Sequence, residues 1–411
     1  MDHGDVAWML TSSALVLIMT PGLAFFYGGL VKRKNIINTI FSSVILMGLG
    51  SVLWVVVGFS LSFSGDFAGI IGNLKWAGFN FNTLTDMTLP YPNTLAFAIF
   101  QMMFAIITPA LITGAIAERM KFSSLVVFTT IWSILVYYPL AHMVWGGGLI
   151  YRMGAVDFAG GDVVHISSGV SALLLSILLG KRKHIEKATY HPHNVPFVVL
   201  GASLLWFGWF GFNAGSALSS NELAIHAFMT TNTSAAAAML SWLMLEKIKN
   251  GKPTLVGAST GLVIGLVAIT PGAGFVPVWA ALVIGAFVSP ICYLFISYVK
   301  PRFSYDDALD VFGCHGVGGI WGGIATGLFA KTSINPAAKW DGLLFGSTEL
   351  FVRQIGAILL TAAIAIVGTF VAYGITSIVT NGIKVSKKDE DLGLDCSQHG
   401  EAAYPAFNGM D

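Results

Sequence analysis

Charged residues are scarce in this chain of 411 residues, of which 10% are charged and 55% are hydrophobic. A soluble domain carries about 25% charged residues, so a folded soluble protein of this length would need far more polar surface. The deficit indicates that lipid is the solvent for much of the surface. The net charge of +1 gives no global field that would favour nucleic acid or an acidic partner.

Cysteine is scarce as well, and the three present are Cys292, Cys314 and Cys396. An odd, sparse set does not make a disulfide framework, so we expect small buried hydrophobes instead. A metal site needs several ligands close together, and the sequence shows no such cluster of Cys, His and carboxylate residues. We therefore expect neither a metal nor a cofactor.

A basic leader and a second soluble domain are missing too. Residues Met1 to Asp5 are acidic, and no clear small-residue cleavage site follows them, whereas a secretory signal peptide has both features. We therefore expect the first apolar run to be a retained helix. With no low-complexity linker in the chain, we expect a transmembrane domain over residues 1–381 and a short cytoplasmic tail over residues 382–411.

Long hydrophobic runs are what the chain does contain. A membrane-spanning helix needs about 20 mostly apolar residues, and eleven runs fit that description. We therefore expect an all-α polytopic membrane protein with eleven transmembrane helices, the last long enough to tilt or to continue beyond the bilayer. The runs are roughly 6–31, 36–64, 94–117, 122–145, 162–180, 195–216, 223–246, 254–270, 275–299, 308–330 and 350–380.

Basic residues gather on one side of these runs. Five alternate loops and the tail hold most of the 22 Lys and Arg residues, beginning with Lys32, Arg33 and Lys34. The opposite side holds only Lys75, Arg152, Lys331, Lys339 and Arg353. The positive-inside rule then predicts a multi-pass protein of the cell membrane, with its N-terminus outside and its C-terminus in the cytoplasm.

A weak internal repeat relates two parts of the chain, about 6–180 and 195–330. Asp157 precedes His165 near the start of the fifth run, and Asp310 precedes His315 in the tenth. Five helices per block would invert the second block, and inverted repeats in transporters place the substrate path at the repeat interface. The eleventh run, about 350–380, lies outside both blocks.

The two histidines are the most informative of these residues. Ionisable groups inside a bilayer are rare and usually functional, although a hydrogen-bonded core histidine is the plain alternative for either one. His165 and His315 stand at matching places in the two blocks. A neutral imidazole has one donor and one acceptor nitrogen, so a facing pair would form a polar stripe in an apolar pore.

Two acids accompany the histidines. Capping a helix N-terminus is the plain interpretation of Asp310, and Asp157 would hold backbone amides in the same way and shape a vestibule. The alternative role is a counter-charge for a cation. We favour structural support for both.

Aromatic residues are dense near the ends of several runs. A cation facing such rings gains ~0.5–2 kcal/mol from each, whereas stripping the hydration shell from an ion in the core costs tens of kcal/mol by Born estimates. An aromatic-gated apolar pore therefore favours a neutral species, although packing against lipid is the common role of such stripes. The residues concerned are Phe100, Phe104, Trp145, Trp206, Phe207, Trp209, Phe210 and Phe212.

Several motifs together resemble the ammonium transporter (Amt/Mep/Rh) family, in its bacterial and archaeal Amt form. They follow one another from the first run to the tenth, so the resemblance covers nearly the whole chain. The motifs are Pro21-Gly22 with Phe25-Phe26-Tyr27-Gly28-Gly29, Gly114 to Arg119, His142 to Gly148, Asp157 to Gly161 with Val164-His165-Ile166, Trp209 to Ser216, and Asp306 to Asp310 with His315-Gly316.

The resemblance implies two inverted five-helix halves plus a peripheral eleventh helix, assembled as a homotrimer with one pore per subunit. It places an outer ammonium site at Phe104, Trp145 and Ser216, with a backbone carbonyl near Ala159. Phe104 and Phe212 would stack as a gate. His165 and His315 would line the pore as twin histidines, and Asp157 would order the outer vestibule.

The tail also resembles that of bacterial and archaeal family members, through Gly393-Leu394-Asp395, His399-Gly400-Glu401 and Ala403-Tyr404. Composition alone would make this polar, turn-rich segment disordered. The resemblance implies partial order under the trimer and a possible PII-type signalling protein as partner.

The function we expect is ammonium uptake. Ammonium binds outside, loses its proton near the gate because desolvation disfavours the charged form, and crosses as ammonia. The proton either follows along the histidines or returns outside. The rival hypotheses are a sensor with little flux, a channel for another neutral solute, and a membrane enzyme, for which Ser167 and Ser168 lack an acid partner at a plausible spacing.

Overall fold

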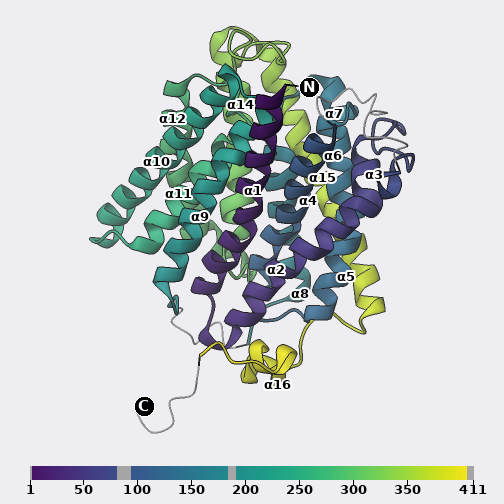
Figure 1. Cartoon of the computed structure of the whole chain (residues 1–411). Helices are drawn as coiled ribbons and strands as arrows, with labels where there is room; N and C mark the ends of the chain where they lie inside the picture. Colours follow the sequence, from purple (N-terminus) through teal and green to yellow (C-terminus); the bar gives the residue numbers. More distant parts are fainter. Residues whose placement is uncertain (1, 81–93, 184–190, 405–411) are drawn as a thin grey trace.

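A computed structural model gives the structure of the chain and describes residues 2–80, 94–183 and 191–404. Within these ranges the regular structure is helical, and β pairing is limited to two isolated bridges. The long helices lie side by side as one bundle, with the N-terminus at the top and the tail helix at the bottom of Figure 1. We call these two ends the upper face and the tail face.

All eleven expected runs contain helices, and eight helices of the described chain are long and apolar enough to cross a membrane. Several are interrupted by short π-helical turns, here labelled η. The elements that carry the bundle are α1 (His3–Leu30), α2 (Ile36–Leu53) with η2 (Trp54–Gly58) and α3 (Phe59–Phe63), α4 (Thr94–Ile116), α5 (Phe122–Trp132) with η4 (Ser133–Tyr137) and α6 (Tyr138–Trp145), α7 (Leu149–Met153), η5 (Gly161–Ile166) with α8 (Ser167–Leu179), α9 (Val195–Ala214), α10 (Glu222–Asn250), α11 (Leu255–Ile269), α12 (Val278–Leu294) with η8 (Phe295–Val299) and α13 (Lys300–Phe303), η9 (Phe312–Gly316) with α14 (Val317–Phe329), and α15 (Thr348–Val379).

Three of the expected runs fall outside the eight spans. They form α10, with 29 residues, α11, with 15, and η9 with α14. The run expected at 308–330 begins late, because residues from Tyr305 to Asp310 form an irregular segment before η9. That segment holds several acids, and its geometry matters below.

Glycines let the backbones cross closely at the centre of the bundle. A Cβ atom built on Gly169 of α8 would lie 2.3 Å from the backbone nitrogen of Gly316, at the end of η9. One built on Gly201 of α9 would lie 2.2 Å from the nitrogen of Phe26 on α1. Small residues that bring backbones together are the usual contact in membrane helices, where lipid removes the hydrophobic drive for association. The Gly169–Gly316 crossing holds the two histidine-bearing segments against each other.

Both histidines lie in π-helical turns, His165 in η5 and His315 in η9. A π turn inserts an extra residue into the i→i−4 pattern and is frequent at functional sites. Both turns continue directly into straight helices, α8 and α14. Each histidine therefore lies where its own helix is locally widened.

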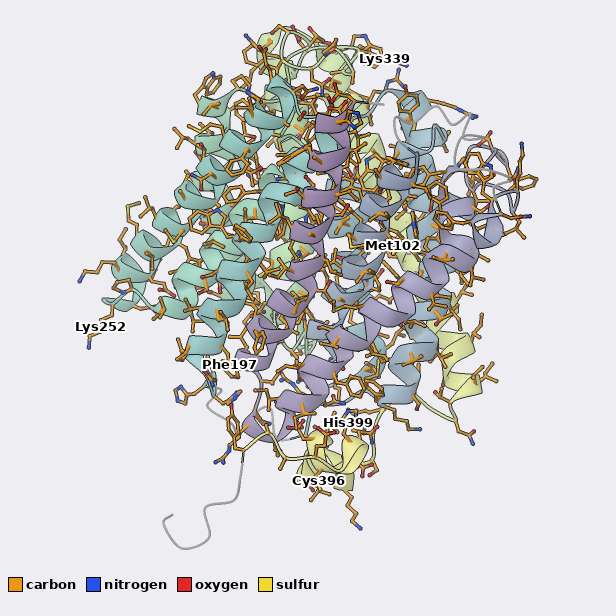
Figure 2. The ribbon with its side chains drawn as sticks, in the orientation of Figure 1. Met102, Phe197, Lys252, Lys339, Cys396 and His399 are labelled. Carbon is orange, nitrogen blue, oxygen red and sulfur yellow. The ribbon has the colours of Figure 1, made fainter. Side chains whose placement is uncertain are left out.

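The described part of the tail folds against the tail face of the bundle (Figure 2). The Leu394 amide donates to Oδ1 of Asn35 at 2.8 Å, and the Asn38 amide donates to Oδ1 of Asp395 at 2.9 Å. The His399 ring lies 4.8 Å from that of Phe122, measured between ring centroids. These contacts order a segment whose composition alone would leave it unfolded.

The three cysteines differ in environment. Cys292 is buried, Cys314 is half-buried and Cys396 in the tail is exposed, and all three are free thiols. The expectation of buried hydrophobes is therefore right for Cys292 and wrong for Cys396, because the tail presents that side chain to solvent (Figure 2).

Candidate functional site

The upper face opens into a cavity of about 380 Å³. Among its lining residues are Phe104 of α4, Trp145 at the end of α6, and Ser216, just beyond α9. The rings of Phe104 and Trp145 meet edge to face with centroids 5.9 Å apart, and the Ser216 hydroxyl donates to the carbonyl of Phe212 at 2.8 Å. Three of the four residues expected at a binding site thus share one cavity.

The fourth expected residue, Ala159, is fully buried, and its neighbour Phe158 is the one whose atoms line the cavity. Trp145 is fixed by its indole N–H, which donates to the carbonyl of Asp157 at 3.0 Å. An indole held in this way presents a fixed π face and edge to the cavity.

Asp157 organises the turn below the cavity. Its carboxylate accepts hydrogen bonds from the amides of Gly160 and Gly161 at 2.7 Å each, and from those of Asp162 at 2.7 Å and Val163 at 3.3 Å. These are donors that the start of a helix leaves unpaired. Asp157 therefore caps η5, the turn that carries His165.

The floor of the upper cavity is a pair of phenylalanine rings. Phe104 and Phe212 lie with centroids 4.3 Å apart and planes 31° apart, and each is at most 1% exposed. Phe100 adds a third ring 4.9 Å from Phe104. Below them lies a narrow cavity of about 10 Å³, lined by Phe212, His165 and His315 among others. Such a volume holds about one water-sized molecule.

The two histidines face each other in this narrow cavity. Their Nδ1 atoms are 3.2 Å apart, and their rings lie 5.3 Å apart with planes 21° from parallel. One Nδ1 must donate and the other accept, which gives the two imidazoles different tautomers. His165 also stacks on Trp209 at 5.4 Å, and its Nε2 has no hydrogen-bond partner among the described residues. The pair thus offers a polar edge in an otherwise apolar cavity.

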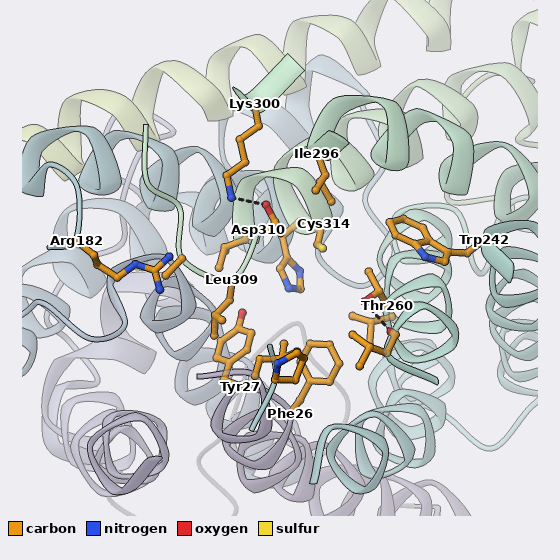
Figure 3. Close-up of a pocket in the computed structure, with 17 residues that line it drawn as sticks. Phe26, Tyr27, Arg182, Trp242, Thr260, Ile296, Lys300, Leu309, Asp310 and Cys314 are labelled. Atoms are coloured by element: carbon orange, nitrogen blue, oxygen red, sulfur yellow. Dashed lines mark hydrogen bonds and ion pairs between the residues drawn. The ribbon is translucent and has the colours of Figure 1, made fainter. Parts of the chain in front are cut away.

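Below the histidines a second large cavity, of about 400 Å³, reaches towards the tail face. His315 lines both this cavity and the narrow one, so the two are contiguous at that ring. Figure 3 shows the lower cavity with Tyr27, Lys300, Asp310 and Cys314 around it. The lower cavity is therefore edged by charges, where the upper one is edged by rings.

Asp310 does not cap the helix that follows it, which corrects the expectation from sequence. Its side chain pairs with Lys300, with Nζ 2.5 Å from Oδ1, as the dashed line in Figure 3 marks. Asp307 is the acid that meets the helix start, accepting the amide of Phe312 at 2.8 Å. The positive φ of 57° at Asp310 turns the chain there and leaves Asp307 facing the amides. Asp310 still supports the structure, as an ion-pair partner.

Sequence reasoning missed an ion network at the tail face. Asp306 accepts two bonds from the Arg182 guanidinium, at 2.9 Å from Nε and 2.8 Å from the terminal nitrogen. Glu118 pairs with Arg182 at 3.2 Å and with Lys32 at 3.7 Å. Burial alone would raise the pKa of Asp306, but Arg182 and Arg119 hold it below its usual value. The sequence did contain a clue to this network, because Glu118, Arg119 and Asp306 all belong to the motifs that carry the family resemblance.

A second missed cluster lies at the upper face. The buried ring of His142 places Nε2 2.8 Å from Oδ1 of Asp66 and Nδ1 3.1 Å from the carbonyl of Ser62. Arg152 donates to the other carboxylate oxygen of Asp66 at 2.9 Å. Hydrogen bonds from His142 and then Arg152 lower the pKa of Asp66. This cluster fastens the loop after α3 to the end of α6.

No group of three or more His, Cys, Asp or Glu side chains in the described ranges is placed to hold a metal ion. From the upper face to the tail face, the site thus consists of a ring-lined cavity, a phenylalanine floor, a histidine pair and a charged lower cavity.

Comparison with known proteins agrees with this geometry. The model of the Ammonium Transporter Family matches residues 7–404. The chain is 48% identical to the "Ammonium transporter" of Bacillus subtilis and 46% identical to "Ammonium transporter Amt1" of Archaeoglobus fulgidus. Each match covers 98% of this chain, with 99% and 100% of those relatives respectively.

Solved structures agree as well. The crystal structure of Saccharomyces cerevisiae Mep2 superposes with a TM-score of 0.89 at 34% identity, over 100% of this chain and 93% of that one. A structure titled "Sensor Amt Protein" superposes with a TM-score of 0.86 at 27% identity, over 96% of this chain and 98% of that one. With a family match across almost its whole length, this chain belongs to the ammonium transporter family.

Proposed function

We propose that this protein recruits ammonium at the upper cavity, where ammonium loses its proton at the phenylalanine floor, and that ammonia then passes His165 and His315 into the cytoplasm. The proton either follows along the histidines or returns to the outside. The observation that carries the proposal is the order of the cavities. Two spaces of about 380 and 400 Å³ are separated by stacked rings and by a histidine-lined space of about 10 Å³.

The upper cavity suits a small cation. Phe104 and Trp145 present π systems that attract a cation with ~0.5–2 kcal/mol each, and the Ser216 oxygen is a polar partner within the same cavity. Of the four expected binding residues, Ala159 would act only through its backbone. We therefore assign recruitment to Phe104, Trp145 and Ser216.

The narrow cavity suits a neutral molecule. It has room for about one water-sized molecule and none for a hydration shell. Moving a bare ion into such a space costs tens of kcal/mol by Born estimates, so the neutral form crosses. The unpartnered Nε2 of His165 offers that molecule a hydrogen bond in an otherwise apolar segment.

The proposal includes an arrangement in the membrane. Eleven helices cross the bilayer, as two inverted five-helix halves with α15 as the peripheral helix, and residues 382–411 form a cytoplasmic regulatory tail. The upper face is then outside, which puts the N-terminus outside and the tail in the cytoplasm, as the positive-inside rule requires. Assembly as a homotrimer and docking of a PII-type protein on the tail face complete the proposal.

The test is ammonium-induced current across a supported membrane that carries proteoliposomes, together with an internal pH dye. A transient current absent from empty liposomes establishes transport with net charge movement. Alkalinisation above the empty-liposome rate without current establishes passage of ammonia alone. Silence in both signals contradicts the proposal and favours a sensor with little flux; one structural neighbour is titled "Sensor Amt Protein".

A further inference from the structure

The first histidine-bearing segment contains a second acid that the path described above does not use. Asp162 follows Asp157 by five positions and lies in η5, within the apolar span Gly161–Leu179. It is 2% exposed, and its own amide donates to Oδ2 of Asp157 at 2.7 Å. An ionised carboxylate at such a place is costly unless a cation or several donors meet it.

No cation meets Asp162 in the described part of the chain. The packed elements α4, α11 and α14 contain no ionisable residue within their bounds. His142 on α6 is bonded to Asp66, and Arg353 on α15 pairs with Glu349. The remaining ionisable residues of the packed elements are Tyr138 on α6, Tyr373 on α15, and Cys314 and His315 on η9.

The charge that does act on Asp162 is that of Asp157. The Asp157 carboxylate accepts four backbone amides, and hydrogen bonds of that kind favour the ionised form. Two neighbouring buried carboxylates cannot both ionise without strong repulsion, so the proton belongs on the one with fewer donors. That one is Asp162.

The carboxyl of Asp162 has few hydrogen-bond donors beside it. Oδ1 of Asp162 is buried and has no hydrogen-bond partner among the described residues, and the hydroxyl of Thr361 on α15 lies beside this carboxyl. A carboxylate has no hydrogen to donate, whereas a protonated carboxyl has one O–H. The Thr361 hydroxyl can donate its own hydrogen to either form of this carboxyl, so the features that favour the protonated form are the burial of Asp162, the lack of a cation beside it among the described residues, and the charge of Asp157.

We propose that Asp162 is a membrane-embedded proton-binding site, neutral in the folded protein, whose proton keeps the Asp157–Asp162 pair at a single negative charge located on Asp157. Asp162 is a positioning residue, since it acts on the upper cavity through Asp157. Its relevance to ammonium rests on the proposed function, because Asp157 lines the cavity where the cation would bind. The corresponding position after Asp307 holds Phe312, so the second segment has no such pair.

Infrared spectroscopy of the full chain in lipid tests the protonation directly. A protonated carboxyl shows a C=O stretching band that a carboxylate lacks. We expect this band at neutral pH in the wild type, its loss in Asp162→Asn, and its persistence in Asp157→Asn. Absence of the band from the wild type, or its loss in Asp157→Asn with persistence in Asp162→Asn, overturns the proposal.

Thermal unfolding as a function of pH gives a second, independent readout. An unfolded Asp ionises near pH ~4, whereas the folded Asp162 stays protonated, so the folded state binds more protons above that pH and wild-type stability falls as pH rises. Asp162→Asn and Asp162→Thr cannot titrate there. We expect their melting temperatures, relative to wild type, to increase steadily from pH 5 to pH 8.

A purely structural role would give a difference that does not change with pH, and that result overturns the proposal. Neither readout needs ammonium flux. A wild type that carries no ammonium signal but shows the Asp162 band would contradict the proposed function and leave the proton site standing. A wild type that transports ammonium but lacks the band would support the proposed function and contradict the proton site.

Discussion

The two histidine-bearing segments are alike in plan and different in surroundings. His165 follows Asp157 by eight positions, and His315 follows Asp307 by the same eight. In each segment the acid accepts amides at the start of a π turn, and the histidine lies in that turn. The repeat expected from Asp157 and Asp310 is therefore better placed on Asp157 and Asp307.

The surroundings of the two acids differ, because only Asp157 lines one of the cavities described above. Asp157 lines the upper cavity beside Trp145, where its carboxylate is held by backbone amides. Asp307 is buried behind the lower cavity, and Lys300, which lines that cavity, donates to the carbonyl of Asp307 at 2.7 Å and to Asp310. Under the proposed function, rings at the entrance attract a cation, whereas paired charges at the exit offer a neutral solute little affinity. Under the proposed function this asymmetry gives the two ends different tasks.

The largest effect is expected from removing both histidines. Under the proposed function, His165→Leu with His315→Leu takes the only polar edge from the narrow cavity described here, and each lost partner for a buried polar solute costs about 1–3 kcal/mol. We expect ammonium current to fall by at least about tenfold. The current should fall less in each single variant. The smaller loss is expected for His315→Leu, because His315 also borders the wider lower cavity.

The control for the double variant is protein that remains folded, shown by an unchanged melting temperature and elution volume. Equal, equally selective uptake in the folded double variant would contradict the role of the histidines. Equal losses in the two single variants would contradict the asymmetry between the segments.

The next effect compares the two acids that cap the π turns. Asp157→Ala leaves four buried amides without their acceptor, each at a cost of about 1–3 kcal/mol where water cannot enter. Asp307→Ala removes the acceptor of a single amide, that of Phe312, and should lower the free energy of unfolding by about 0.5–2 kcal/mol, as for other helix caps. Melting temperatures in detergent measure both. A larger loss for Asp307→Ala would show that the two caps are wrongly ranked.

The sequence predicts the helices far better than the site. Apolar runs of about 20 residues are enough to place helices at all eleven positions, because lipid leaves the chain few other ways to pair its backbone. The sequence also predicts that the two histidines face each other, as they do, and three of the four residues expected at a binding site share the upper cavity. The matching places of the two histidines predict the pair, whereas the residues of the upper cavity are implied only by the family resemblance.

What the sequence did not predict depends on backbone detail. A π turn has no local composition signal, and nothing in Asp306 to Asp310 distinguishes which acid caps and which pairs with Lys300. The eight-position spacing shared by Asp157 and Asp307 was an available clue. The Arg182–Asp306 and His142–Asp66 contacts join residues more than 70 positions apart, so they required the fold.

A smaller effect should separate two glycines on the facing helices. Gly169→Ala puts a Cβ 2.3 Å from backbone atoms of Gly316, which cannot yield as a side chain does, whereas Gly318→Ala meets a Val267 methyl at 3.3 Å. Overpacking of this kind typically costs about 1–3 kcal/mol, so Gly169→Ala should lower the melting temperature and Gly318→Ala should change it little. Gly48→Ala, which meets nothing within 4 Å, is the open-space control. Equal losses at Gly169 and Gly318 would mean that the crossing is not tight.

The smallest effect concerns pH at the upper face. His142 and Arg152 hold the pKa of Asp66 below its usual value, so the pairing contributes stability above the unfolded pKa of about 4 and loses it as pH falls through the lower, folded value. Asp66→Asn should therefore lower the melting temperature slightly at neutral pH and bring it closer to wild type in strong acid. Glu349→Gln, which breaks an exposed pair with Arg353, is the control and should show no such convergence. If the Asp66→Asn deficit were instead constant from pH 7 to pH 3, the loop after α3 would be held by its neutral contacts, and the charge on Asp66 would contribute nothing.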